Sequence, residues 1–376
     1  MAITEQLGSR RARTAGVRPD SPLLHVDWVV IATTAFLSGI GLLMIRSAGA
    51  SSFVQKQVLF MVLGIGVMFA VMSVDYRVFV DSAVLIYAAT VVALLAVLSP
   101  LGTVHKGAQG WFDVGSFQLQ PAEFAKIAII VSLAGYGAAQ RSQLDLRRFF
   151  VVLILTAVPT FLIFIQPDLG SALVFLAIAL AMLWLGGARA GHVATLIVLG
   201  AVSVFLAVRV FHVLADYQTN RLLAFINPNG DIGGSAFNLN QSKIAIGSGG
   251  LFGKGLLHGT QTRYGFVPEQ HSDFIFTALC EQLGLLGGGA VLLAFGVLCA
   301  RIWRAAASAR DTAGTLICVG VLAMFLFHIF QNIGMTMGMM PITGIPLPLL
   351  SYGGSSTIVS FAAIGLVLNV EMHRFR

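Results

Sequence analysis

The residue types most able to do proton chemistry lie at the edge of an apolar run. The segment 268–273 reads Pro-Glu-Gln-His-Ser-Asp and leads directly into the apolar residues Phe274–Phe276. A carboxylate, Asp273, and an imidazole, His271, therefore lie together at the mouth of an apolar segment. Charged groups at such an edge cost free energy unless the protein uses them. Asp273, with His271 beside it, is therefore the first candidate for a functional site.

An acid and a base occur together in a second apolar segment. Glu123 and Lys126 are three residues apart and follow Pro121, a residue favoured in the first turn of a helix. This spacing places both side chains on one helix face, where the pair can neutralise itself in the bundle interior. A structural ion pair and a functional pair lining a polar cavity both remain open.

Two further segments contain a polar residue or residues that interrupt a helix. Asp168 follows a Gln-Pro pair; its position favours a cap on a helix beginning near Leu169, and the alternative is a place in the same cavity. The segment 340–356 contains three prolines and three glycines, which preclude a regular helix. Broken backbone at membrane depth occurs only where protein or a water-filled cavity covers it. We expect this segment and the Asp273 segment to form one site. Transporters also build binding sites from interrupted helices, so this feature does not separate transport from catalysis.

The composition indicates the class of fold that positions these residues. Of the 376 residues, 57% are hydrophobic and 10% are charged, and the mean hydropathy is +0.87. Soluble proteins have about 25% charged residues, so the chain is predicted to be an all-α, polytopic membrane protein with about ten transmembrane helices in one bundle. The net charge of +7 does not indicate nucleic acid, because the basic residues are scattered between apolar runs. Cys280, Cys299 and Cys318 lie in apolar runs and are predicted to be packing residues.

The apolar runs give the expected spans and their orientation. They cover residues 27–46, 57–74, 78–98, 119–138, 149–166, 169–186, 193–211, 274–300, 312–334 and 355–370. Residues 1–24 are predicted to be a polar cytoplasmic tail, and residues 25–376 a single transmembrane domain with a long outer loop, about 212–273, before the eighth span. Most arginines fall on one side, so the positive-inside rule places both termini in the cytoplasm and the unusual polar sequence on the outer face.

The long outer loop holds Gln241, Lys243 and a run of glycines from Gly247 to Gly255. A nucleotide-binding loop is disfavoured, because no strand precedes the glycines and no GK[ST] sequence follows them. Two readings stay open. The glycine backbone and Lys243 could approach an anion closely, or the segment could be a flexible surface loop.

Five segments in this order carry a resemblance to a known family: Gln120–Glu123, Gln166–Gly170, Gln241–Lys243, Pro268–Phe276 and Pro346–Ser356. Together they resemble the SEDS family (shape, elongation, division and sporulation), and within it the elongation branch more than the division branch. The resemblance covers residues 25–370. It implies a peptidoglycan glycosyltransferase that polymerises lipid II on the outer face of the cytoplasmic membrane. It also implies a cognate class B penicillin-binding protein and other membrane proteins of the elongation complex as partners.

The resemblance also implies residue roles. Asp273 matches the motif aspartate, the expected general base that deprotonates the sugar 4-hydroxyl of the acceptor during one inverting displacement. His271 either orients Asp273 or satisfies a loop carbonyl. The residues expected to contact substrate or line its cavity are Glu123, Lys126, Asp168, Arg221, Gln241, Lys243, His271, Ser351, Tyr352 and Ser355.

The diphosphate leaving group of such a reaction needs positive charge. The candidates are Lys126, Arg221, Lys243, Lys254 and Arg263, and a divalent cation, Mg²⁺ or Mn²⁺, held by Asp273 or Glu123 is a further source. The family usually has an arginine before the residue that is Trp111 here, where this chain has Gly110. We expect its contribution to come from another residue, with Lys106 as a candidate.

Two functions from other classes remain as alternatives. A flippase for a lipid-linked cell-wall precursor would use the same cavity and broken helices but would need no general base. A scaffold that only recruits the penicillin-binding protein would need no chemistry at all. The variant Asp273→Asn separates them, because only a polymerase loses nearly all activity.

Overall fold

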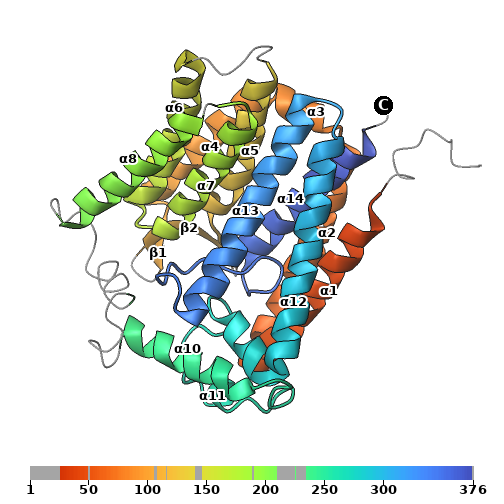
Figure 1. Ribbon diagram of the computed structural model, residues 1–376, viewed down its shortest axis with the longest axis vertical. Helices are drawn as coiled ribbons and strands as arrows, with labels where there is room; N and C mark the ends of the chain where they lie inside the picture. The colour runs from red at the N-terminus through yellow and green to blue at the C-terminus, as the bar shows by residue number, and fades with distance from the viewer. Residues whose placement is uncertain are drawn as a thin grey trace, which may run out of the picture.

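The computed structural model describes residues 26–49, 51–105, 108–115, 117–139, 146–188, 190–209, 225 and 234–374. The predicted N-terminal tail, Lys106 and Arg221 lie outside the described residues. Long helices run side by side through most of the molecule (Figure 1). Helices α10 and α11 lie at one end of this bundle, and α3 and the C-terminus lie at the other (Figure 1).

Every predicted span corresponds to helix in the structure, and the third consists of two helices, α3 and α4. The bounds are α1 (Trp28–Ala48), α2 (Ser51–Ser73), α3 (Tyr76–Asp81), α4 (Ala83–Leu98), α5 (Pro121–Ala138), α6 (Leu146–Ile165), α7 (Leu169–Leu185), α8 (Ala190–Arg209), α12 (Ile275–Ser308), α13 (Thr312–Met337) and α14 (Gly354–Met372). Among the described residues, α1, α2, α12, α13 and α14 are long and apolar enough to cross a membrane, and shorter apolar helices accompany them. The chain is therefore mostly helical, as expected of an integral membrane protein.

Small residues allow the closest helix packing. At Gly64 of α2, an added Cβ would lie 2.7 Å from the Phe361 ring of α14, and at Gly365 of α14 it would lie 2.9 Å from the Met68 carbonyl oxygen. Helices in membranes pack through such positions because van der Waals contact, rather than water exclusion, holds them together. Helix α13 packs against α5, α7 and α12, so its polar residues face the interior.

Two parts of the fold differ from the expectation of transmembrane helices joined by loops. The connection after α4 forms an antiparallel sheet in the order β1 (Thr103–His105), β2 (Ala108–Val114) and β3 (Phe117–Leu119). The segment expected to be a loop, 212–273, contains α10 (Ser235–Gly249) and α11 (Thr260–Arg263). These elements are short or rich in polar residues and glycine, so their sequences carry little apolar periodicity.

Two glycines, Gly249 at the end of α10 and Gly253 after it, pack against the backbone of α12. An added Cβ at Gly249 would lie 2.0 Å from the Cys280 carbonyl oxygen, and one at Gly253 would lie 2.1 Å from that of Gln282. Gly253 also has a φ of +80°, a conformation that other residues rarely adopt. The backbone N–H of Lys254 donates to the Glu281 carbonyl at 3.0 Å. These glycines are therefore a packing surface, which neither the flexible-loop nor the anion-site interpretation predicted.

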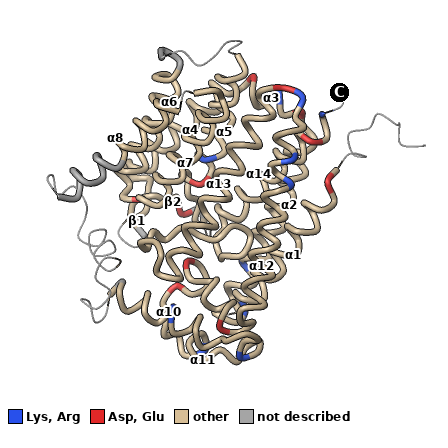
Figure 2. The backbone as a smooth tube through the Cα atoms, viewed as in Figure 1, with Lys and Arg blue, Asp and Glu red and all other residues tan. Residues whose placement is uncertain are grey.

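Charged residues gather mainly at the two ends of the bundle, and a few lie between them (Figure 2). At the end that holds α3 and the C-terminus, Arg301 pairs with Asp27 at 2.5 Å and Arg77 with Asp311 at 3.3 Å. Asp27 precedes α1, so the start of α1 and the end of α14 lie at the same end of the molecule (Figure 1).

Candidate functional site

Three successive backbone carbonyls fix the turn that carries Asp273. The Tyr352 N–H donates to the His271 carbonyl at 2.9 Å, and the Ser351 hydroxyl donates to the Ser272 carbonyl at 2.6 Å. The Asn332 amide donates to the carbonyl of Asp273 itself at 2.9 Å. Because these donors come from α13 and from the broken segment before α14, the predicted meeting of the two segments is confirmed. The Asp273 side chain is half-buried at this junction.

Aromatic rings surround His271 in the same turn. Its ring stacks on Phe53 with centroids 4.4 Å apart and meets the Tyr352 ring edge-on at 5.5 Å. His271 Nε2 lies 3.9 Å from the Glu269 carboxylate. Burial raises the pKa of Tyr352, so its hydroxyl stays protonated at neutral pH. Ring contacts as well as hydrogen bonds therefore hold the turn between α2 and the broken segment.

Buried amides hold the broken segment in place. Asn332 also donates to the Ile345 carbonyl at 2.8 Å. Gln57 of α2 donates to the Thr357 hydroxyl at 3.0 Å and accepts from the Gly353 N–H at 3.2 Å. Backbone groups freed from helical hydrogen bonding therefore find partners inside the protein, as apolar surroundings require.

Glu123 and Lys126 form the predicted ion pair on one face of α5. The Lys126 ammonium donates to the Glu123 carboxylate at 2.5 Å, and both residues are buried. The ammonium also lies 3.1 Å from His328 Nε2 of α13, while His328 Nδ1 lies 2.8 Å from the Met324 carbonyl. Since a carbonyl only accepts, His328 Nδ1 carries the proton and Nε2 accepts from the ammonium. His328 precedes Asn332 by one helical turn, so the pair lies one turn from the Asp273 contact.

Asp168 caps α7, as its position favoured. Its carboxylate accepts from the N–H of Ser171 at 2.9 Å and from the hydroxyl of Ser171 at 2.7 Å. It also accepts from the Gln120 amide at 3.0 Å, which joins two of the motifs. The Ser355 hydroxyl accepts a hydrogen bond from the Gln120 N–H at 3.0 Å. At Gly170, an added Cβ would lie 2.8 Å from Ile345. These contacts bring the motif segments around residues 120, 168 and 350 together.

Helix α10 carries the third motif. The buried Ser242 hydroxyl lies 2.6 Å from the Thr277 hydroxyl of α12 and donates to the Thr336 carbonyl of α13 at 2.8 Å. Gln241 is half-buried, and Lys243 is exposed beside Gly338 at the end of α13. Ser242 therefore docks the helix, and Lys243 is left at the surface near the end of α13.

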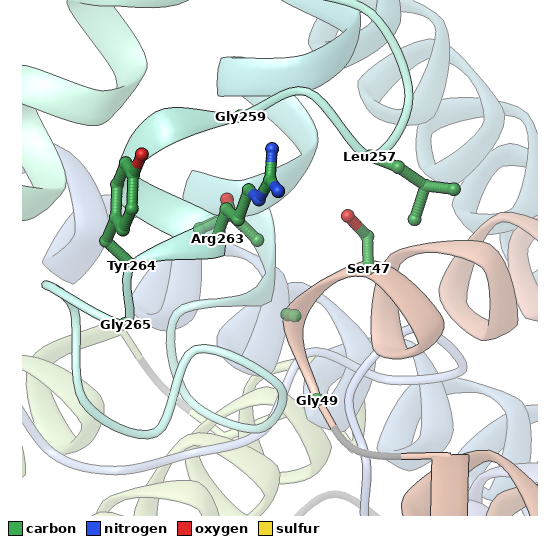
Figure 3. Close-up of a pocket in the computed structure, with 9 residues that line it drawn as sticks. Ser47, Gly49, Leu257, Gly259, Arg263, Tyr264 and Gly265 are labelled. Carbon is green, nitrogen blue, oxygen red and sulfur yellow. The ribbon is translucent and has the colours of Figure 1, made fainter.

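The remaining predicted cations have different surroundings. Lys254 pairs with Glu281 at 3.1 Å, and this fully buried carboxylate also accepts from the Thr262 hydroxyl at 2.7 Å. Lys126 is committed to Glu123. Arg263 lies at a cavity between the ends of α1 and α11 (Figure 3). Of the described candidates, Lys243 and Arg263 are the exposed ones.

Metal binding has little support from side chains alone. In the part of the chain that the structure describes, no group of three or more His, Cys, Asp or Glu side chains could hold a metal ion. Glu123, one predicted ligand, is already paired with Lys126. The divalent cation stays a prediction.

Gly110, where the family usually has arginine, is buried in β2. An added Cβ would lie 3.7 Å from the side-chain oxygen of Gln166. Gln166 in turn donates to the Leu94 carbonyl at 3.2 Å. The position therefore faces the segment that leads to Asp168, and a long side chain there would reach it.

Sequence reasoning missed four residues that organise the site: Gln57, Glu281, His328 and Asn332. Each is a polar residue inside an apolar helix, and each is at least 95% buried. That isolation was the available signal, because buried polar groups are retained only where they have partners.

A bundle of apolar helices with a polar site beneath a broken segment defines a helical integral membrane protein whose site lies toward one end. A model of the family described as "Cell cycle protein", covering FtsW, RodA and SpoVE, matches residues 25–376. The chain belongs to this family, and the resemblance seen in its motifs is confirmed.

Known relatives and structures match over nearly the whole chain. Peptidoglycan glycosyltransferase MrdB of Escherichia coli (strain K12) is 35% identical over 353 residues, covering 93% of this chain and 95% of the relative. Stage V sporulation protein E of Bacillus subtilis (strain 168) is 37% identical over 360 residues, covering 92% and 97%. A chain of a solved structure described as "Structural coordination of polymerization and crosslinking by a peptidoglycan synthase complex" has a TM-score of 0.82 at 29% identity, covering 93% and 99%. The rod shape determining protein RodA of Thermus thermophilus has a TM-score of 0.72 at 28% identity, covering 93% and 98%.

Proposed function

We propose that this chain is a peptidoglycan glycosyltransferase that polymerises lipid II during cell elongation, with Asp273 as general base. The observation that carries the proposal is the fixing of the Asp273 turn by three successive carbonyl contacts, where the motif segments meet. The names of the relatives, which include peptidoglycan glycosyltransferases, support the same activity.

The reaction follows from a positioned carboxylate. Asp273 accepts the proton of the acceptor sugar 4-hydroxyl, while that oxygen attacks the anomeric carbon of the lipid-linked donor. The bond from this carbon to the diphosphate breaks, and the lipid diphosphate leaves. One displacement inverts the anomeric centre, so no covalent sugar intermediate forms. Fixing the backbone of the base reduces the entropy lost in reaching the reactive geometry.

The leaving diphosphate requires positive charge at the same end of the bundle. Lys243 and Arg263 are the exposed described candidates. A divalent cation would be held mainly by the phosphate oxygens and by one or two carboxylates, a common arrangement for Mg²⁺. Asp273 is the predicted ligand that remains, since Glu123 is occupied by Lys126.

The membrane orientation and partner belong to the same proposal. Ten spans with both termini in the cytoplasm place α10, α11 and Asp273 on the outer face of the cytoplasmic membrane, in agreement with the positive-inside rule. The synthase complex that resembles this chain couples polymerisation to cross-linking, in the words of its description. We assign a class B penicillin-binding protein as the cross-linking partner of this chain.

Reconstitution tests the activity directly. The purified protein, together with its penicillin-binding partner and lipid II in vesicles, is expected to give glycan polymer that a muramidase digests. Movement of labelled lipid II across the bilayer without polymer would instead identify a flippase. A penicillin-binding protein with its own transpeptidase serine replaced serves as the partner in a parallel reaction, so that cross-linking does not obscure strand length.

A further inference from the structure

A cavity of about 530 Å³ lies between the end of α1 and the segment around α11 (Figure 3). Ser47 and Gly49 line it on one side, and Leu257, Thr262 and Arg263 line it on the other. It is a different place from the buried Glu123–Lys126 pair. The proposed reaction has so far involved it only through Arg263, one of the two exposed candidate cations for the diphosphate.

The cavity borders the turn that carries Asp273. An added Cβ at Gly49 would lie 3.7 Å from the Cβ of His271 and 3.1 Å from the Phe53 ring that stacks on His271. The Asp273 turn is therefore one residue layer away. The cavity and the Asp273 turn thus share Gly49 as a neighbour.

An arginine side chain, Arg263, projects at this cavity. The Arg263 guanidinium points into the space between Gly259 and Ser47, and the Tyr264 ring stands on the other side of it (Figure 3). No described residue forms a hydrogen bond or ion pair with this guanidinium. Tyr264 is 69% exposed. An arginine fork beside an exposed aromatic face suits a ligand that carries both a carboxylate and a sugar or other flat apolar surface.

Buried amides behind the wall have atoms left without partners. Gln282 is fully buried; its side-chain oxygen accepts from the Ser47 hydroxyl at 2.8 Å and from the Leu257 N–H at 2.9 Å. Its amide nitrogen has no partner among the described residues. The side-chain oxygen of Gln270 has none there either, while the amide nitrogen of Gln270 donates to the Thr262 hydroxyl at 3.0 Å. Buried polar groups are nearly always hydrogen-bonded. Both amides contact lining residues, so they supply polar groups just behind the cavity wall.

Charge limits the kind of anion that fits. The cavity lies at the C-terminal end of α1, where the helix dipole is negative, and Arg263 is the one cation that lines it among the described residues. One arginine opposed by that dipole is better matched to a single carboxylate than to a diphosphate. We propose that the cavity is a subsite for the disaccharide-peptide unit of the substrate or strand, with Arg263 holding a peptide carboxylate and Tyr264 packing on a sugar. This inference rests on the proposed polymerase activity.

Binding of a soluble ligand tests the subsite apart from catalysis. The probe is a lipid-free disaccharide carrying the stem peptide, titrated against the full chain in detergent. The Arg263→Ala variant is expected to bind it about tenfold more weakly, as loss of one charge-assisted contact implies. Amidation of the peptide carboxylates should weaken binding to the wild type equally. Arg310→Ala, which removes an exposed arginine at the opposite end of the bundle, should change nothing.

The aromatic contact has its own matched control. Tyr264→Ala should weaken binding, whereas Phe252→Ala, which removes an exposed ring of the same segment outside the cavity, should not. Wild-type protein that does not bind the probe, or Arg263→Ala protein that binds it within twofold of wild type, overturns the proposal. A short oligomer of the unit distinguishes the source: tighter binding per unit identifies the growing strand, and equal binding identifies a single substrate.

Failure of the subsite and failure of the polymerase are separable. Asp273→Asn is expected to bind the probe like wild type while losing polymerisation. If Asp273→Asn polymerises normally, the general base is wrong and the binding result still decides the subsite. If Arg263→Ala polymerises with unchanged KM and strand length, the subsite is wrong and the activity stands.

Discussion

Asp273 owes its position to contacts that its own backbone makes. The carbonyls of His271, Ser272 and Asp273 each accept a hydrogen bond from another segment, so the turn cannot rotate without breaking several of them. Asn332 is central, since its amide reaches both Asp273 and Ile345. A general base held in this way keeps its geometry before substrate arrives, which lowers the barrier to reaction.

The variant Asn332→Leu keeps the size of the side chain and removes both donations. We expect polymerisation to fall about 10- to 100-fold, because small displacements of a base have effects of this size. Gln331→Leu is the matched control: it removes a neighbouring amide of the same helix that donates to Pro341 rather than to the Asp273 turn. The measurement is the initial polymerisation rate at equal amounts of folded protein, confirmed by gel filtration. Equal rates in the two variants would show that Asn332 does not position the base.

At this scale the sequence indicated several polar residues that the structure brings together, and little of what holds them in place. Asp273, Asp168 and the Glu123–Lys126 pair could be found because charge in an apolar chain is conspicuous. Gln57 and Asn332 could not be assigned, because their role depends on which broken backbone lies across from them. That information is three-dimensional, since the partners are 13 to 300 residues apart along the chain.

Among the elements, the packing of α12 against the segment that follows α10 depends on Gly253. At Gly253 the added Cβ of alanine would meet the Gln282 carbonyl, and its φ is also positive. Gly253→Ala should therefore destabilise the protein by about 1–3 kcal/mol. Gly247→Ala is the control, because nothing lies within 4 Å of its added Cβ and alanine favours the helix. Thermal unfolding in detergent compares the two, and equal midpoints would contradict the packing role.

At the opposite end, Asp311 ties α3 to the start of α13. Burial raises the pKa of this carboxyl, but donation from the Gly314 N–H, Tyr76 and Arg77 outweighs it, so the pKa lies below its usual value. A depressed pKa means that this contribution to stability is complete above the ordinary pKa and is lost as pH falls through the folded-state pKa.

Acid unfolding tests that link. Relative to wild type, Asp311→Asn should be less stable at pH 7 and should lose less stability on acidification below about pH 5. Asp81→Asn replaces an exposed acid of α3, the short helix that Asp311 contacts, and should follow the wild-type curve. The free energy of unfolding is measured against pH by denaturant titration. A variant curve parallel to that of wild type would show that Asp311 is not coupled to folding.

The long helices were predictable because apolar runs and their boundaries are local. The sheet β1–β3 was not, since its strands have only three to seven residues and show little alternation of apolar and polar residues. Helix α10 was also missed. Its docking relies on Ser242 and on glycine contacts with α12, and neither produces an apolar stripe.

At the scale of the whole molecule, the proposed membrane topology has α10 and α11 outside the cell and the α3 end inside. With the native cysteines replaced by alanine, His258→Cys should react with a membrane-impermeant thiol reagent in intact cells or spheroplasts. Ala307→Cys, also exposed but at the other end of α12, should react only after permeabilisation. The reverse pattern would invert the topology and move the site to the cytoplasm.

The polymer formed from lipid II tests the central claim most directly. Wild type, Asp273→Asn and the control Asp113→Asn are compared as complexes with the penicillin-binding partner, at matched yield and thermal midpoint. Asp113 is an exposed residue of β2 that lies outside the five motif segments. We predict full polymer from wild type and Asp113→Asn and a loss of at least about a hundredfold in Asp273→Asn, the upper range for a missing general base. Equal polymer from Asp273→Asn would contradict the account.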